Sequence, residues 1–119
     1  MSGGRDFVDR IAGQLLPLGP VEPRRMFGGW GLFLDGVMFA LIARDRLYLK
    51  ADAETAARFE DAGCAPFTYQ RKGKTIALSY REAPADAVDN PDSLLPWAEL
   101  AVAAARRNRP QRKSRRRPR

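Results

Sequence analysis

Two strand-like runs around an Asp-Gly pair constrain the fold of this 119-residue chain more than any other feature. The runs are Trp30–Leu34 and Val37–Ala43, and both are rich in the apolar residues that favour strands. Asp35-Gly36 between them accepts the positive φ angles of a type I′ turn, whose twist matches that of the flanking strands. A second reversal at Arg44-Asp45 leads into a further apolar run, so residues 25–50 predict a three-stranded meander.

Helices and a second hairpin are expected around this meander. Phe7, Ile11 and Leu15 recur at helical spacing, and prolines and glycines follow them. The expected elements are a helix at about 5–16, an extended lead-in at 21–26, the meander, a helix capped by Asp52 and ended by Gly63, a hairpin of 67–71 and 74–80 around Lys72-Gly73, a connector at 81–89 and a final helix. Short turns can join all five strands, which predicts a two-layer α+β fold with a mainly antiparallel sheet.

The final helix has two alternative starts. Asn90 can cap it with Pro91 in the first turn, or Ser93 can cap it with Pro96 in the first turn. We expect the helix to fray near residue 107 in both cases. Both starts give the same apolar stripe, which consists of Leu94, Trp97, Ala101 and Ala104.

The run Val37–Ala43 is apolar throughout instead of alternating, which is typical of a strand covered on both faces. Loops and the amino-terminal segment can provide the second cover within one chain. Alternatively, another protein chain covers it, and a homodimer is one such arrangement, because an exposed apolar patch of this kind is unusual on a monomer. The sequence leaves both interpretations open.

The positive charge of the chain is concentrated at its carboxy terminus. The formal charge is +7, but residues 106–119 hold nine basic side chains and no acid. The other 105 residues hold 12 Lys and Arg against 14 Asp and Glu, a formal charge of −2. We therefore predict a near-neutral domain at 1–105 and a disordered Arg-rich tail at 106–119, since the tail has no apolar anchor.

Binding of a polyanion is the function that such a tail favours. Basic arms bind phosphates by counterion release with little sequence selectivity, and about six phosphate contacts would give a log–log salt slope of roughly −5. A solubility appendage without a partner is the alternative, and a membrane is not expected because no apolar residue or lipidation site accompanies the charge. The predicted nucleic-acid-binding residues of the tail are Arg106, Arg107, Arg109, Arg112, Lys113, Arg115, Arg116, Arg117 and Arg119.

Three further cations lie at the tip of the second predicted hairpin. Arg71, Lys72 and Lys74 are either solvated turn charges or a finger that touches phosphate, and the finger requires the tail on the same side. We include them among the predicted nucleic-acid contacts.

Several classes of site are disfavoured by the residues present. The chain has no histidine, which removes imidazole catalysis and histidine-ligated zinc. Cys64 is the only cysteine, so an intrachain disulfide is excluded and a small buried side chain is expected. Gly28-Gly29-Trp30-Gly31 precedes a strand instead of a helix, so it predicts a bend or a close backbone approach and not a phosphate loop.

The acids show no metal-ligand spacing, since Asp86, Asp89 and Asp92 lie in a connector with proline. We expect no catalytic residue, no metal and no cofactor. The sequence has no signal peptide and no apolar run of about 20 residues, which predicts a cytoplasmic protein.

A set of motifs carries a family resemblance. They are Met26-Phe27-Gly28-Gly29-x-Gly31, Leu34-Asp35-Gly36-x-Met38-Phe39-Ala40-Leu41, Arg46-Leu47-Tyr48-Leu49-Lys50, Phe67-x-Tyr69-x-Arg71-Lys72-Gly73-Lys74 and the helix near Pro91. In these motifs the chain resembles, over about residues 5–105, the amino-terminal domain of the TfoX/Sxy family of bacterial competence regulators. The motif residues expected to be structural are Met26, Phe27, Gly28, Gly29, Gly31, Asp35, Gly36 and Phe39.

The resemblance implies a small α+β fold similar to secretion chaperones and a cytoplasmic regulatory role without catalytic residues. By analogy it implies a protein partner of the transcription-activator kind, such as the cyclic-AMP receptor protein. Longer family members carry a second helical domain, which this sequence lacks, so we expect a single-domain member with a basic tail.

We therefore predict a non-enzymatic regulator or adaptor. Its domain would recognise a protein through the sheet or a strand edge, and its tail would add nucleic-acid contact. The alternative is a chaperone-like protein-binding module with no nucleic-acid role.

Overall fold

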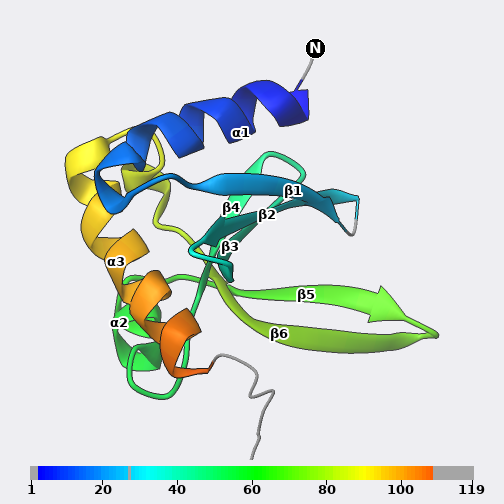
Figure 1. The fold of residues 1–119 in the computed structure, drawn as a ribbon. Coiled ribbons are helices and arrows are strands. Elements are labelled where there is room, and N and C mark those ends of the chain that lie inside the picture. Colours follow the sequence, from blue (N-terminus) through cyan, green and yellow to red (C-terminus); the bar gives the residue numbers. More distant parts are fainter. Residues whose placement is uncertain (1–2, 27, 109–119) are drawn as a thin grey trace, which may run out of the picture.

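An antiparallel sheet of six strands in the order β1-β2-β3-β4-β6-β5 organises the computed structural model, which describes residues 3–26 and 28–108 (Figure 1). The strands are β1 (Glu22–Met26), β2 (Gly29–Leu34), β3 (Val37–Ala43), β4 (Arg46–Lys50), β5 (Pro66–Arg71) and β6 (Lys74–Glu82). The helices are α1 (Gly3–Gln14), α2 (Ala56–Asp61) and α3 (Pro91–Arg107), with short 3-10 helices at Leu16–Leu18 and Ala85–Ala87. The predicted α+β class with an antiparallel sheet is confirmed.

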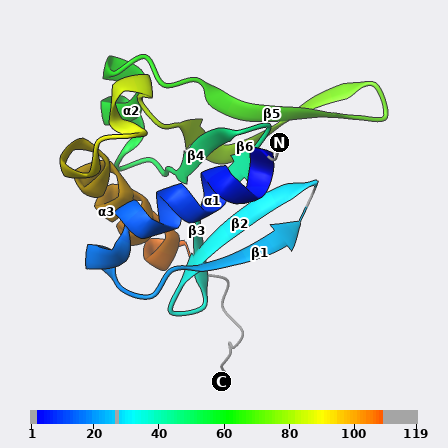
Figure 2. The same ribbon diagram turned by 90° about the horizontal axis from the view of Figure 1, so that it is seen from above.

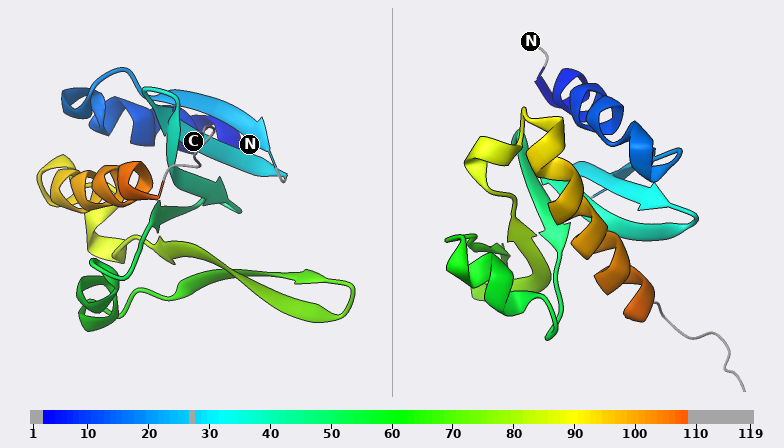
Figure 3. Two further views of the ribbon diagram at one scale, coloured as in Figure 1. Left: turned by 60° about the horizontal axis from the view of Figure 1, so that its bottom comes forward. Right: turned by 90° about the vertical axis from the view of Figure 1, so that its left-hand side faces the viewer.

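All three helices lie on one side of the sheet, and the β1–β2 and β5–β6 hairpins project away from α3 (Figures 1 and 2). Seen from the left-hand side of Figure 1, α3 crosses in front of the strands, with α1 above it and α2 beside it (Figure 3, right). We call the covered side the helix face and the opposite side the open face. On the helix face α3 contacts β3 and β4, and α1 contacts β1, β2 and α3.

Small side chains let α3 lie close to the sheet. Its buried residues include Leu94 together with alanines at 98, 101, 104 and 105. Three residues of the predicted stripe are therefore buried, and the fourth, Trp97, is half-buried against the core. The tilted packing of Phe59 on Trp97, with 5.0 Å between ring centroids, joins α2 to α3. The helix starts at Pro91 with Asn90 as its cap, which decides between the two predicted starts. Pro96 therefore lies inside the helix.

Strand β3 is buried within a single chain. A bulge opposite Leu32 and Phe33 places both Phe39 and Ala40 in the core on the helix face. Leu41, on the open face, is only 2% exposed, and its register partners are Gly31 and Tyr48. The apolar sequence of this strand therefore does not require a second chain, and the homodimer stays a prediction.

Two methionines lie beside Gly31, the register partner of Leu41 in β2. The sulfur atoms of Met26 and Met38 both lie within van der Waals reach of the space that a Cβ of Gly31 would occupy. A glycine at position 31 thus lets the two thioethers meet over the centre of the open face. The cover predicted from loops and the amino-terminal segment stays a prediction.

Three turns of two residues connect the strands in hairpins. Asp35 and Gly36 have φ angles of 53° and 80°, which confirms the predicted type I′ geometry at this turn. Arg44-Asp45 (φ 54° and 60°) and Lys72-Gly73 (φ 52° and 79°) repeat it. All three predicted reversals are therefore present, each with both central residues in the left-handed region.

The glycine run 28–31 forms a turn and a close strand contact. Gly28 has φ +73° in the β1–β2 turn, and a Cβ on Gly29 would overlap the carbonyl oxygen of Ile42 in β3. Strand β2 follows the run, so the predicted bend, close backbone approach and following strand are confirmed. Of the motif residues predicted to be structural, Phe27 lies outside the described residues. The others lie in β1, β2, β3 and the turns between them: Met26, Gly28, Gly29, Gly31, Asp35, Gly36 and Phe39.

Two predicted boundaries were wrong. The extended lead-in expected at 21–26 is an edge strand, so the sheet has six strands and not five. The sequence did not predict a strand here because the segment contains Pro23, Arg24 and Arg25. Prolines and charged residues are, however, typical of edge strands. Helix α2 begins at Ala56, after a turn at 53–55 that Asp52 caps by accepting the backbone N–H groups of Glu54 and Thr55.

Substitution of Gly29 by Ala should destabilise the protein by about 2–3 kcal/mol, because the added methyl must displace the backbone of β3. Gly13→Ala is a matched control: Gly13 lies in α1 with nothing within 4 Å of the added carbon, so this change should stabilise by about 0.5–1 kcal/mol. Urea unfolding of both variants measures the difference, and equal midpoints would contradict the close contact.

Candidate nucleic-acid interface

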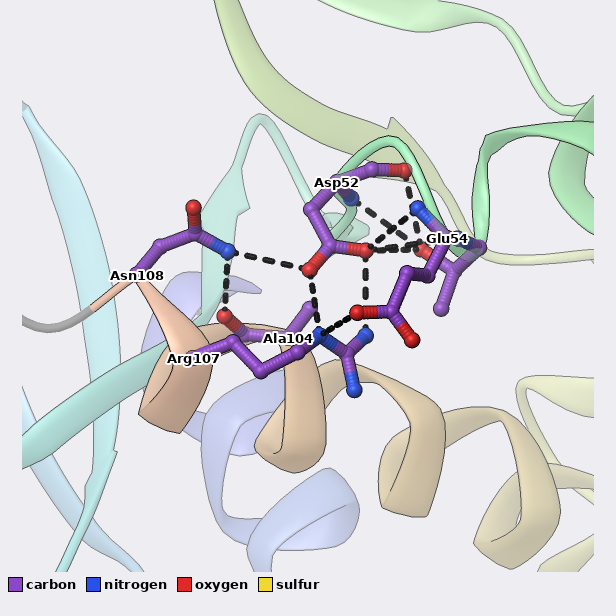
Figure 4. Close-up of polar contacts among 6 residues, drawn as sticks. Asp52, Glu54, Ala104, Arg107 and Asn108 are labelled. Atoms are coloured by element: carbon purple, nitrogen blue, oxygen red, sulfur yellow. Dashed lines mark hydrogen bonds and ion pairs between the residues drawn. The ribbon is translucent and has the colours of Figure 1, made fainter.

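The carboxy-terminal end of α3 is held by an acidic clasp formed by Asp52 and Glu54 (Figure 4). Arg107 donates from Nε to Asp52 Oδ2 at 2.7 Å and from Nη2 to Asp52 Oδ1 at 3.0 Å, a bidentate pair. Its Nε also lies 3.1 Å from Glu54 Oε2. The Asp52 side chain is only 12% exposed, so solvent screens this pair less than a surface pair.

Asn108 completes the clasp. Its Nδ2 donates to Asp52 Oδ2 at 3.0 Å and to the carbonyl oxygen of Ala104 at 2.7 Å, which also accepts the backbone N–H of Asn108 at 3.1 Å. On the other side of the helix end, Arg106 Nη2 lies 3.1 Å from Asp35 Oδ2 in the β2–β3 turn. These contacts fix the point at which the chain leaves the domain.

The predicted tail boundary at 105/106 falls inside the last turn of α3. Arg106 and Arg107 are helical, and both guanidinium groups already contact carboxylates. Their predicted role in nucleic-acid binding has therefore to compete with these pairs. The remaining predicted tail contacts lie outside the described residues: Arg109, Arg112, Lys113, Arg115, Arg116, Arg117 and Arg119.

The three hairpin cations stand apart from this helix end. Arg71, Lys72 and Lys74 are exposed at the tip of β5–β6. Tyr80, on the same strand as Lys74, lines a pocket with Asn108, so one strand links the tip to the place where the tail begins. The six residue steps from Lys74 to Tyr80 span roughly 20 Å. The structure thus connects the two predicted sets along β6 but does not bring them into contact.

The described residues offer little for metal binding or thiol chemistry. Within the described part of the chain no three His, Cys, Asp or Glu side chains are grouped to hold a metal ion. Cys64 is buried, as predicted, and burial raises the pKa of its thiol. None of the helices in residues 3–26 and 28–108 has the length and hydropathy of a membrane span.

Comparison with known proteins identifies the family. The model of the TfoX N-terminal domain matches residues 13–105. The chain belongs to the TfoX/Sxy family. It is 36% identical over 97 residues to DNA transformation protein TfoX1 of Aliivibrio fischeri. The aligned region covers 82% of this chain and 46% of that relative.

Two further relatives agree. Protein Sxy of Escherichia coli is 27% identical over 103 residues, 87% of this chain and 49% of Sxy. DNA transformation protein TfoX of Haemophilus influenzae is 33% identical over 84 residues, 70% of this chain and 38% of that protein. The chain thus matches half or less of the length of each of these relatives.

The hydrogen bond from Arg107 is the main reason that the pKa of Asp52 lies well below its ordinary value. A carboxylate with a lowered folded-state pKa stabilises the fold above its unfolded pKa of about 4, and this contribution is lost as the pH falls. The clasp is therefore complete at neutral pH and weakens in acid.

Asp52→Asn should cost about 1–2 kcal/mol at pH 7, because the amide keeps one acceptor for the 53–55 turn but loses the charge opposite Arg107. The difference from wild type should shrink as the pH falls below about 4. Urea unfolding at pH 7 and pH 3 measures both effects.

Glu54→Gln is the control for this experiment. The Glu54 side chain is 69% exposed, so this substitution should change the free energy of unfolding by no more than about 0.5 kcal/mol. Equal losses in both variants would contradict the role of Asp52.

Proposed function

We propose that this chain is a non-enzymatic regulator or adaptor of the competence type, acting in the cytoplasm. Its domain binds a protein partner of the transcription-activator kind, and residues 109–119 add contact with nucleic acid. The match of residues 13–105 to the TfoX N-terminal domain carries this proposal, together with relatives named as DNA transformation proteins. The absence of histidine from the sequence and the buried thiol of Cys64 support the non-enzymatic part.

The nucleic-acid contact rests on the charge distribution. Seven of the 11 residues from 109 to 119 are Lys or Arg, and none is acidic. The cations just before them, Arg106 and Arg107, neutralise carboxylates of the domain. Of the nine basic side chains in 106–119, the seven in residues 109–119 are therefore the ones left for a polyanion.

A strand edge supports the protein contact. The sheet ends in β1 and β5, and β1 carries Pro23 with three charged neighbours, which discourages pairing with another strand. In β5 the only proline is the first residue, Pro66, and four residues after Phe67 are exposed. An extended peptide could add to this edge through main-chain hydrogen bonds.

A chain that ends at Asn108 should bind a 20-base-pair duplex at least tenfold more weakly than the full chain. Its log–log salt slope should fall from roughly −5 toward zero, because the released counterions are lost with the tail. The melting temperature should not change, since Arg106, Arg107 and Asn108 stay in place. Fluorescence anisotropy between 50 and 200 mM salt measures the affinity.

Arg58→Gln is the control for this experiment, because it removes an exposed cation of α2. It should leave duplex affinity within about twofold. If the shortened chain bound the duplex as tightly as the full chain, the tail contact would be wrong, and the chaperone-like alternative without a nucleic-acid role would replace it.

A further inference from the structure

The open face of the sheet carries a row of aromatic rings that the sequence analysis did not single out. Tyr48 and Phe67 pack edge to face with centroids 4.8 Å apart, and Tyr69 follows at 6.4 Å from Phe67. Tyr80 and Phe33 lie on the same face by strand alternation. All three tyrosines of the chain are thus on this face.

The row is accessible to a ligand. Tyr69 is 37% exposed and is, with Leu16, one of two large hydrophobic residues that the described chain exposes. Phe67, Tyr48 and Tyr80 are partly exposed. Burial raises the pKa of Tyr80 to about 12, so its phenol stays neutral and adds no negative charge to the face.

Cations accompany these rings. Lys50 Nζ lies 5.2 Å from the centre of the Tyr80 ring, and Arg24 Cζ lies 4.5 Å from that of Phe33. Arg71 and Lys74 are register partners at the end of the row, on the side of Tyr69 by alternation.

The acids of this face are already neutralised. Glu22 pairs with Arg24 and Glu82 with Arg46, each at 3.2 Å. Within residues 3–26 and 28–108, no carboxylate lies within 4 Å of the charged groups of Lys50, Arg71 or Lys74. The open face therefore has an excess of positive charge among aromatic rings.

A pocket joins this face to the start of the basic tail. It has a volume of about 360 Å³, within the range of small-ligand pockets, and its walls include Phe33, Lys50, Tyr80 and Asn108. Asn108 directly precedes the basic residues 109–119. The last described residue of the chain is thus part of the pocket wall.

We propose that the open face binds single-stranded nucleic acid, with bases stacked on Tyr69 and Phe67 and phosphates near Lys50, Arg71 and Lys74. Stacking on a sheet needs unpaired bases, because the bases of a duplex already stack on each other. Aromatic rings interleaved with cations match bases interleaved with phosphates more closely than they match an acidic peptide. This inference rests on the nucleic-acid part of the proposed function and names the form of the ligand.

Tyr69→Ala in the full chain tests the proposal. Its affinity for a fluorescein-labelled 12-nucleotide oligo-dT should fall roughly 5- to 150-fold, the range for loss of one stacked base, while its affinity for a 12-base-pair duplex stays within twofold. Tyr69→Phe should restore single-strand binding because it keeps the ring. Leu16→Ala, which removes the other exposed apolar side chain, should have no effect.

Lys50→Gln adds a second readout. The salt slope of oligo-dT binding should decrease by about one, as expected when one phosphate contact is removed. Circular dichroism melting should show that each variant keeps the wild-type fold.

The outcomes separate this inference from the proposed function. If duplex binding needs residues 109–119 but Tyr69→Ala does not change the affinity for oligo-dT, the inference is wrong and the proposed function stands. Oligo-dT binding that depends on Tyr69 but not on residues 109–119 would support the inference and remove the tail contact. Competition by a poly-glutamate peptide at the concentration effective for oligo-dT would show a protein-binding face and overturn the inference.

Discussion

The close packing of α3 on β3 is the contact on which the rest of the structure depends. Alanines at 98, 101 and 105 bring the helix near Phe39, Ala40 and Ile42, and α1 covers β1 and β2 on the same face. With all helices on one side, the opposite side of the sheet is left to its own side chains. Both the buried Leu41 and the aromatic row follow from this one-sided arrangement.

The end of α3 relates the helix layer to the charged tail. Asp52 comes from the loop after β4 and Asp35 from the β2–β3 turn, so two separate parts of the sheet layer hold adjacent arginines of one helix. Because these pairs lie on either side of the helix end, the last turn is oriented as well as stabilised. Asn108, at this end of the helix, lines the same pocket as Lys50 and Tyr80 of the sheet.

Local signals made most of the fold predictable. Asp-Gly and Lys-Gly pairs between apolar runs indicated two hairpins, and Asn90-Pro91 was one of the two predicted starts of α3. The strand at 22–26 was not predicted, because its proline and arginines argue against a central strand although an edge strand tolerates them. The pairing of Asp52 with Arg107, 55 residues apart, had no local signal. The aromatic row did have one, since Phe67, Tyr69 and Arg71 alternate along β5, but only the sheet order adds Tyr48 to it.

The two-residue connections at 35–36, 44–45 and 72–73 have a consequence for sequence variation. A two-residue turn cannot accommodate an extra residue, so an insertion would shift the pairing of a strand by one position. Side chains that face the helices would then face the open side, and the reverse. Core leucines would then point to solvent while tyrosines entered the helical layer. Length changes among related domains should therefore concentrate at the ends of helices and in the 83–90 connector, where backbone spacing is not tied to which side a residue occupies.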